Sequence, residues 1–250
     1  MEKEMTNRLD DINELLCYND KKIENINSIY LTAFDNYSII ISKVEVKNIL
    51  ENYRSILDFC IHDIDDIIYN GLIKDIYFPY GKDMSLFTKS LNKNKLNDLV
   101  RINKNVYSLL LNIQSFQSSN QWLYNLCKLT NINKHDKLTR PLKKVNKLSY
   151  KLGDRINIQN CGKVIFKDSY YNGRTIGKDE NNYVEIGPET TPDELRAQTN
   201  NEIPVTITSG KVEFNIQLNE QTIEIKKLLN EISLGIKSFI NLLYTELGVI

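Results

Sequence analysis

Histidine is scarce in this sequence, and the cysteines are too scattered to form a familiar metal or redox site. The chain has 250 residues with only two histidines. Cys17, Cys60, Cys127 and Cys161 lie far apart and form no Cys-x-x-Cys pair, which argues against a zinc knuckle or a thioredoxin-like site. We expect buried, reduced thiols, no metal and no cofactor.

An excess of one charge and a long apolar run are also lacking. Lys+Arg and Asp+Glu both number 32, so no net charge draws the whole molecule to nucleic acid, although a local patch still could. The first residues, Met1–Glu4, are charged, and no window approaches 18 uncharged apolar residues. We therefore expect a cytoplasmic protein that does not enter a membrane, from a bacterial source.

Glycine is rare in the first part of the chain and frequent in the middle. Before Gly153 only Gly71 and Gly81 occur, and six glycines then follow between 153 and 210. This change in the frequency of glycine predicts a helical bundle over 1–148, a strand-rich insertion over 149–218 and a C-terminal helix over 219–250 that completes the bundle. The fold class expected is α+β, mainly α, with a small antiparallel sheet.

Apolar spacing of three and four residues predicts the helices. The stripe from Met5 to Tyr30 fits one bent helix or two. Ser42 and Glu45 have capping-box spacing and open a helix over 43–70. Shorter helices are expected at 83–91, 95–100 and 103–115, and a last one after the Ser118–Gln121 cap.

Alternating apolar residues predict strands from Lys151 onward, around 156–158, 164–166, 183–186 and 212–218. Thr191 and Pro192 favour one short helix within this part. After Asn219 a helical stripe returns, too apolar to stand alone in water, so this helix should pack on the earlier ones.

Four residues at four-residue steps form a charged ladder on the helix over 43–70: Arg54, Asp58, His62 and Asp66. Such i,i+4 pairs commonly stabilise a solvated or interhelical helix face. The functional alternative is that Asp58 or Asp66 orients His62 as a general acid or base, with His135 brought near it by packing of the bundle.

A polar helix end, Asn131-Ile132-Asn133-Lys134-His135, is the other candidate for chemistry. Cations at a helix C-terminus are favoured by the dipole, which is a purely structural reason for Lys134 and His135. The functional alternative is that Asn131, Lys134 and His135 hold a phosphate or act on a ribose hydroxyl.

Basic residues are concentrated just after this helix end, where a single acid, Asp136, interrupts them. Such a strip suits phosphate-backbone binding, and Trp122 or Tyr150 would add base stacking if exposed. The alternative is that the strip neutralises acidic helices. The candidate nucleic-acid contacts are Lys137, Arg140, Lys143, Lys144, Lys147 and Lys151.

Two segments resemble a family of uncharacterised bacterial helical proteins. One runs from Tyr53-Arg54-Ser55-Ile56-Leu57-Asp58 to Ile76-Tyr77-Phe78-Pro79, and the other from Trp122-Leu123-Tyr124-Asn125-Leu126 to the Asn-Lys-His end. The bundle is also similar to the HEPN superfamily, which implies a metal-independent ribonuclease using an Arg and a His a few residues apart. Here no Arg stands at that distance before His135.

Three functions remain open from sequence. The leading hypothesis is a nucleic-acid-associated or partner-binding helical module, and the resemblance suggests a bacterial defence or mobile-element system as its setting. The second is a ribonuclease or phosphate-handling enzyme of HEPN-like type centred on His135 and Lys134, with Asn131, His62 and Arg54 near it. The third is a structural subunit that pairs with another protein or with itself.

Overall fold

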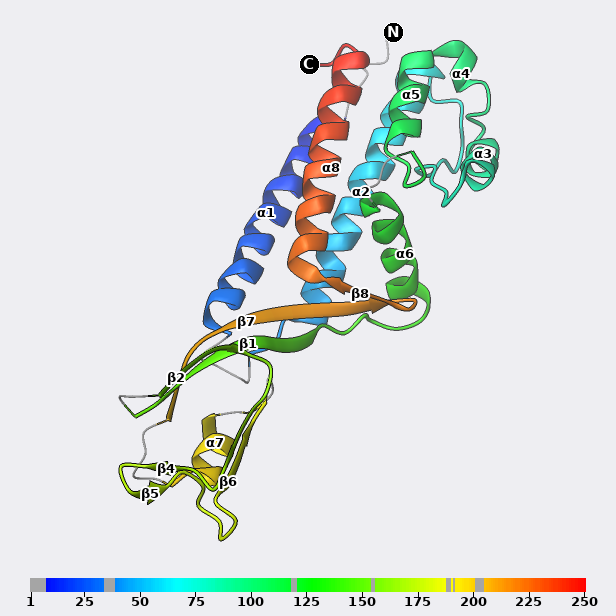
Figure 1. Ribbon diagram of the computed structural model, residues 1–250. Coiled ribbons are helices and arrows are strands. Elements are labelled where there is room, and N and C mark those ends of the chain that lie inside the picture. Colours follow the sequence, from blue (N-terminus) through cyan, green and yellow to red (C-terminus); the bar gives the residue numbers. More distant parts are fainter. Residues whose placement is uncertain are drawn as a thin grey trace. The chain divides into compact units, whose positions relative to one another are not determined.

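The computed structural model describes residues 8–33, 39–117, 121–153, 156–187, 190, 192–200 and 205–250 (Figure 1). Within these ranges, the side chains at 145–148, 160–161, 192–193, 205 and 207–210 are not described. The chain forms two compact units. The first contains Met1–Ile26, Ser42–Arg140 and Ile216–Ile250, and the second contains Asn27–Ile41 and Pro141–Asn215.

The first unit is built on four long helices: α1 (Leu9–Thr32), of which residues 9–26 belong to this unit, α2 (Lys43–Ile68), α6 (Trp122–His135) and α8 (Ile225–Glu246). α1 runs antiparallel to α2, because Arg8 pairs with Asp63 near the end of α2 while Asn19 donates to the Ile49 carbonyl near its start. α8 runs parallel to α2, whereas α6 runs in the opposite direction (Figure 1). The expected bundle with a returning C-terminal helix is confirmed.

Three short helices accompany the far end of α2: α3 (Met84–Lys93), α4 (Leu99–Ile102) and α5 (Lys104–Asn112). Side-chain caps fix where helices begin, with Ser42, Asp83 and Asn103 each accepting a backbone N–H three residues on. The helix expected over 95–100 is wrong, because Lys95 has φ +57° and helical geometry starts only at Leu99. The first helix is continuous from Leu9 to Thr32, and both Met5 and the Ser118–Asn120 part of the expected cap lie outside the described residues.

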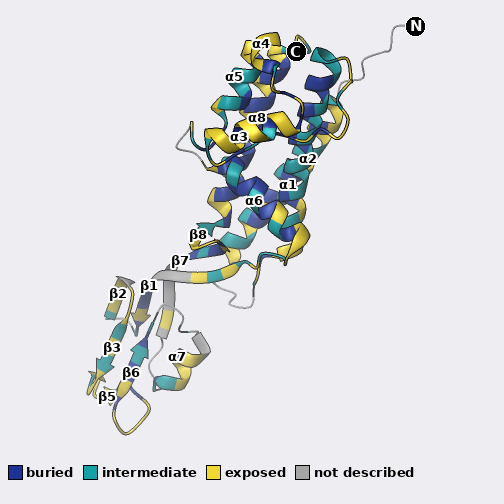
Figure 2. Ribbon diagram, turned by 90° about the vertical axis from the view of Figure 1, so that its right-hand side faces the viewer, coloured by how far each residue is buried: buried dark blue, intermediate teal, exposed yellow. Residues whose placement is uncertain are grey.

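The core of this unit is the apolar face of α8 against α2, α5 and α6. Figure 2 shows buried positions along the bundle helices. Trp122 is only 4% exposed and lies against Gly235 of α8, where the absence of a side chain makes room for the indole. The tryptophan therefore supports packing, and the exposure that base stacking by Trp122 would require is absent.

A polar contact closes the end of the bundle where α2 stops. The carboxylate of Asp63, 1% exposed, accepts hydrogen bonds from Arg8 and from the hydroxyl of Tyr244 on α8. Asp66 also pairs with Arg8, at 2.8 Å. Burial raises the pKa of Tyr244, so its hydroxyl stays protonated and remains a donor. One buried carboxylate thus joins α1, α2 and α8.

The strands begin earlier than the sequence pattern predicts. β1 (Leu142–Leu152), β2 (Ile156–Cys161), β7 (Val205–Leu218) and β8 (Gln221–Glu224) form one sheet in the order β2-β1-β7-β8. β1 pairs antiparallel with both β2 and β7. Its first half is lysine-rich, and the apolar alternation does not predict a strand there. Tyr150 is 1% exposed and donates to the Gly187 carbonyl, so it does not offer the exposed ring that base stacking would require.

Outside this sheet, the second unit also contains two antiparallel strand pairs and a short helix. β3 (Val164–Lys167) pairs with β6 (Tyr183–Ile186), and β4 (Tyr170–Tyr171) pairs with β5 (Arg174–Thr175). Asn172 and Gly173 both have positive φ, as a two-residue type I′ hairpin turn requires. α7 (Pro192–Gln198) is the short helix expected after Thr191.

Removing the buried carboxylate should cost more than removing the exposed one. In Asp63→Ala the buried Tyr244 hydroxyl loses its carboxylate acceptor, and we expect a loss of about 1–3 kcal/mol in the free energy of unfolding. Asp66→Ala breaks only a partly exposed pair with Arg8 and should cost under about 1 kcal/mol. Urea denaturation measures both, and equal losses would contradict the role given to Asp63.

Filling the space at Gly235 should disturb the tryptophan. A Cβ at Gly235 would lie 2.4 Å from Trp122 Cε2, so Gly235→Val should destabilise by about 1–3 kcal/mol through overpacking. Asn230→Val, at an exposed position of the same helix, is the matched control for the β-branched side chain. The measurement is unfolding followed by the fluorescence of the single tryptophan; a control variant that loses as much stability would refute the contact.

Candidate functional site

Arg54 is the centre of the polar cluster that joins α2, the 76–81 segment and α6. Its guanidinium donates to Cys127 Sγ at 2.9 Å and to the Phe78 carbonyl at 3.2 Å. It also pairs with Asp58 at 3.3 Å and lies over the ring of Tyr80, 5.5 Å from the centroid. Asp58 in turn accepts the backbone N–H of Phe78. The Phe-Pro segment is thereby held against both helices.

Electrostatics keep Arg54 charged and the Cys127 thiol protonated at neutral pH. Burial acts to lower the pKa of Arg54, but Cys127, Asp58 and Tyr80 outweigh it, so the pKa lies above its usual value and the guanidinium stays charged. Burial raises the pKa of Cys127 to about 11 despite the nearby Arg54. The thiol is therefore a hydrogen-bond acceptor for Arg54, and it is a poor nucleophile at neutral pH.

Two of the predicted site residues are brought together through Tyr80. Asn131 donates from Nδ2 to the Tyr80 hydroxyl at 2.9 Å, and the ring of Tyr80 faces Arg54. Tyr80 is half-buried, and burial is the first cause of its raised pKa. Neither Tyr80 nor Cys127 was singled out from sequence as a site residue, since an isolated Tyr and a Cys within an apolar stripe carry no distinctive signal.

The two histidines lie far from each other. Each is eight residues from the Arg54–Cys127 contact, and because α2 and α6 run in opposite directions they extend from it in opposite senses. Eight residues span about 12 Å of helix axis. The arrangement in which His62 and His135 share one composite site is therefore wrong for this fold.

His62 also lacks the oriented carboxylates expected from the ladder. Asp58 is engaged by Arg54 and by the Phe78 N–H, and Asp66 by Arg8. No hydrogen bond joins the His62 ring to the residues that the structure describes. The ladder residues Arg54, Asp58 and Asp66 therefore make contacts that hold the fold together.

The polar end of α6 is exposed. Lys134, His135, Lys137 and Arg140 all face solvent, and none forms an ion pair with a described residue. The helix ends with the N–H of Asp136 donating to the Ile132 carbonyl, and Asn133 accepts from Thr139 in the loop that follows. The free cations therefore lie on an ordered helix end and its anchored loop.

The lysines of β1 occupy different surroundings. Lys143 donates to the Ala33 carbonyl at 2.5 Å, and burial lowers its pKa. Lys144 is exposed on the neighbouring strand position, opposite Glu213, and therefore on the other face of the sheet. Lys151 is exposed, and the side chain of Lys147 lies outside the described residues. Lys143 and Lys144 therefore do not form one exposed row on the same face of the sheet.

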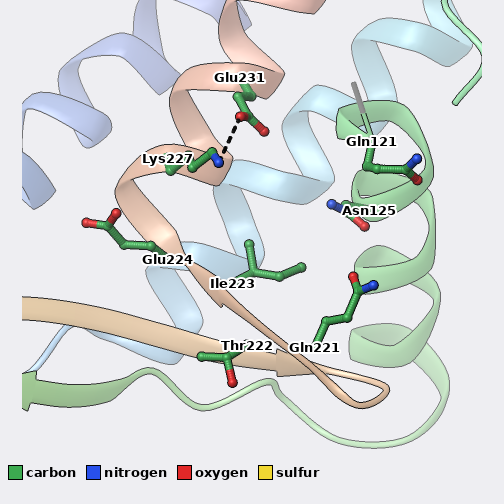
Figure 3. Close-up of a pocket in the computed structure, with 8 residues that line it drawn as sticks. All are labelled: Gln121, Asn125, Gln221, Thr222, Ile223, Glu224, Lys227 and Glu231. Carbon is green, nitrogen blue, oxygen red and sulfur yellow. Dashed lines mark ion pairs between the residues drawn. The ribbon is translucent and has the colours of Figure 1, made fainter. Parts of the chain in front are cut away.

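A pocket of about 460 Å³ opens between α6, β8 and the first turns of α8 (Figure 3). Figure 3 shows the carboxamides of Gln121, Asn125 and Gln221 on one side of it and the Lys227–Glu231 ion pair, 3.9 Å long, on the other. The pocket is lined by Gln121, Asn125, Gln221, Thr222, Ile223, Glu224, Lys227 and Glu231. None of these residues was predicted as a site residue, because they come from three elements distant in sequence.

Neither a metal-ligand cluster nor a membrane-spanning helix is found in the described part of the chain. No group of three or more His, Cys, Asp or Glu side chains there is arranged to hold a metal ion. None of the described helices is both long enough and apolar enough to cross a membrane.

The thiols give a direct test of the Arg54 cluster. At pH 8 a pKa of about 11 leaves roughly one thousandth of Cys127 as thiolate, whereas Cys17 is exposed. In a Cys161→Ser background we expect a disulfide reagent such as Ellman's to titrate Cys17 alone in the native protein. Cys60 and Cys127 should react only after urea is added; rapid native labelling of Cys127, identified by mass spectrometry, would show that the cluster is open.

Comparison with protein-family models, with curated proteins and with solved structures finds no match to this chain. The resemblance to HEPN-like proteins and to a bacterial helical family therefore stays a prediction.

Proposed function

We propose that this protein is a nucleic-acid-binding module that contacts phosphates through one end of its helical bundle. The cations concerned are named here the basic end: Lys43, Lys134, His135, Lys137 and Arg140. All five are exposed. Lys43 belongs to it because α2 starts at the end of the bundle where the antiparallel α6 stops. The observation that supports the proposal is that none of these cations pairs with an acid among the described residues.

The alternative, that these cations neutralise the acidic part of α2, finds no support in the geometry. The carboxylates of Asp63 and Asp66 bind Arg8, and that of Asp65 accepts the Ile73 N–H. These acids lie near the last turns of α2, whereas the basic end lies at its start. Because the chain as a whole is neutral, this segregation creates a local positive field suited to a polyanion.

Within the basic end, Lys137 and Arg140 should contribute most. Lys134 and His135 stand in the last turn of α6, where the partial negative charge of the helix terminus offsets part of their attraction for an anion. Lys137 and Arg140 lie beyond that turn, and the guanidinium of Arg140 offers bidentate hydrogen bonds to a phosphate. Contacts of this kind to phosphate groups contribute affinity but do not discriminate between base sequences.

The geometry supports binding more strongly than cleavage. The amide of Asn131 donates to Tyr80, and no described side chain hydrogen-bonds to His135 to orient its ring. A general acid or base is normally held in place by such a partner. We therefore place His135 among the phosphate contacts.

Salt dependence tests the proposal. We expect the protein to bind a labelled single-stranded RNA of about 20 nucleotides with an affinity that falls steeply as salt rises from about 50 to 200 mM. Lys134→Gln/Lys137→Gln/Arg140→Gln should lower the affinity and reduce the slope of log K against log salt by roughly 2, from three lost contacts at about 0.7 each. Fluorescence anisotropy measures both quantities.

The matched control removes the same number of charges elsewhere in the same unit. Lys74, Lys89 and Lys93 are exposed and lie toward the opposite end of the bundle. Lys74→Gln/Lys89→Gln/Lys93→Gln should leave affinity and slope nearly unchanged. Binding that is absent, independent of salt, or lost equally in both triple variants would overturn the proposal.

A further inference from the structure

We propose that the outer face of α6 binds unpaired bases, so that the nucleic acid held by the basic end is a single strand. This inference rests on the nucleic-acid proposal and deepens it. Phosphate contacts at the basic end do not involve the bases. The neighbouring surface of α6 has three features that do favour bases: a polar stripe, two adjoining tyrosine rings, and a lack of acidic side chains.

The stripe is the first feature. α6 packs on α2 and α8 and lies on the side of the bundle away from α1 (Figure 1). Four of its residues, at steps of four, three and four, lie on one helix face: Tyr124, Lys128, Asn131 and His135. All four are at least partly exposed. This set, named here the α6 stripe, joins the basic end at His135.

The two tyrosine rings are the second feature. The Asn131 amide donates to the Tyr80 hydroxyl at 2.9 Å, and Arg54 lies over the Tyr80 ring, 5.5 Å from its centroid. Burial is the largest cause of the raised pKa of Tyr80, and the electrostatic interaction with Tyr124 is a smaller one, which indicates that the two side chains lie near each other. The side chain of Tyr124 makes no hydrogen bond or aromatic contact with a described residue, so its ring can take a further partner.

Tyrosine rings on a basic surface suit unpaired bases. Every base has a flat face that stacks on an aromatic side chain, so stacking tolerates any sequence. Trp122 and Tyr150, the two rings considered for stacking from the sequence, are both buried, whereas Tyr80 and Tyr124 are partly exposed. Bases in a duplex are paired and stacked on one another, and only an unpaired strand can present them to such rings.

The charge and the length of the stripe also suit a strand. α6 contains no Asp or Glu, and Lys128 forms no ion pair with a described residue. Asp58, which holds the Phe78 N–H of the segment before Tyr80, is paired with Arg54 at 3.3 Å. The stripe is about 16 Å long at about 1.5 Å per residue. A stacked strand advances about 3.4 Å per nucleotide, so roughly four or five nucleotides fit along it.

The test compares two strands of equal charge on the intact protein: an oligouridine of about 20 nucleotides and an abasic strand with the same ribose-phosphate backbone. We expect the wild-type chain to bind oligouridine at least about fivefold more tightly, which is the low end of the gain from one stacked base. Tyr124→Leu should weaken oligouridine binding by at least about this factor and leave the abasic strand unaffected. Tyr124→Phe keeps the ring and should bind like the wild type. Fluorescence anisotropy measures all four affinities.

Tyr18→Leu is the matched control for the lost ring. Tyr18 is 47% exposed on α1, and the neighbouring Asn19 bonds to Asn52, which projects from α2 on the side opposite Arg54. This variant should leave both strands unaffected. Lys128→Gln should weaken both strands and reduce the slope of log K against log salt by about 0.7, since it removes a phosphate contact.

The wild-type chain alone already decides the inference, because equal affinity for the two strands overturns it without any variant. A Tyr124→Leu variant that binds oligouridine normally overturns it too, as does a loss that is equal for both strands or is matched by Tyr18→Leu. In these cases salt-dependent binding through Lys134, Lys137 and Arg140 still supports the nucleic-acid proposal. Absence of salt-dependent binding to either strand overturns both proposals together.

Discussion

The burial of the apolar face of α8 is the constraint on which the first unit depends. Ile232, Ile236, Phe239 and Leu243 are at most 1% exposed, and they contact helices that lie far earlier in the chain. At about 25 cal/mol per Å² of apolar surface, a helix of this length supplies a large share of the hydrophobic stabilisation available to the bundle. Both candidate sites follow from it, since α8 forms one wall of the pocket and supports α6, whose exposed end carries the cations.

The polar contacts of the bundle add specificity to this apolar packing. Asp63 ties α1 and α8 to α2, and Arg54 ties α6 and the Phe-Pro segment to the same helix. Each fixes a rotation and a register that apolar contacts alone would leave loosely defined. α2 is the common partner in both clusters, and its charged ladder therefore serves the architecture more than it serves chemistry.

Elements with a long apolar stripe could be predicted from the sequence. Features that depend on contacts between residues distant in sequence could not. The helices near 43–70 and after 219 could be foreseen from their stripes, and the α+β fold with a returning helix is confirmed. β1 was missed because its lysines obscure the alternation. The pairing of Arg54 with Cys127 and the gathering of Gln121, Asn125 and Gln221 could not be read from spacing, since helix direction and hairpin position bring them together. The position of His135 at an exposed helix end was predictable, whereas its distance from His62 was not.

The order in which the bundle segments occur along the chain has a consequence for biosynthesis. α1, α2 and α6 leave the ribosome before Pro141–Asn215, and α8 follows only afterward. At 5–20 residues per second this interval lasts roughly 4–15 seconds, during which the nascent helices have no α8 to cover their apolar faces. Chaperones that bind exposed apolar segments would have that time to act, so the yield of folded protein should be sensitive to translation speed through the intervening strands.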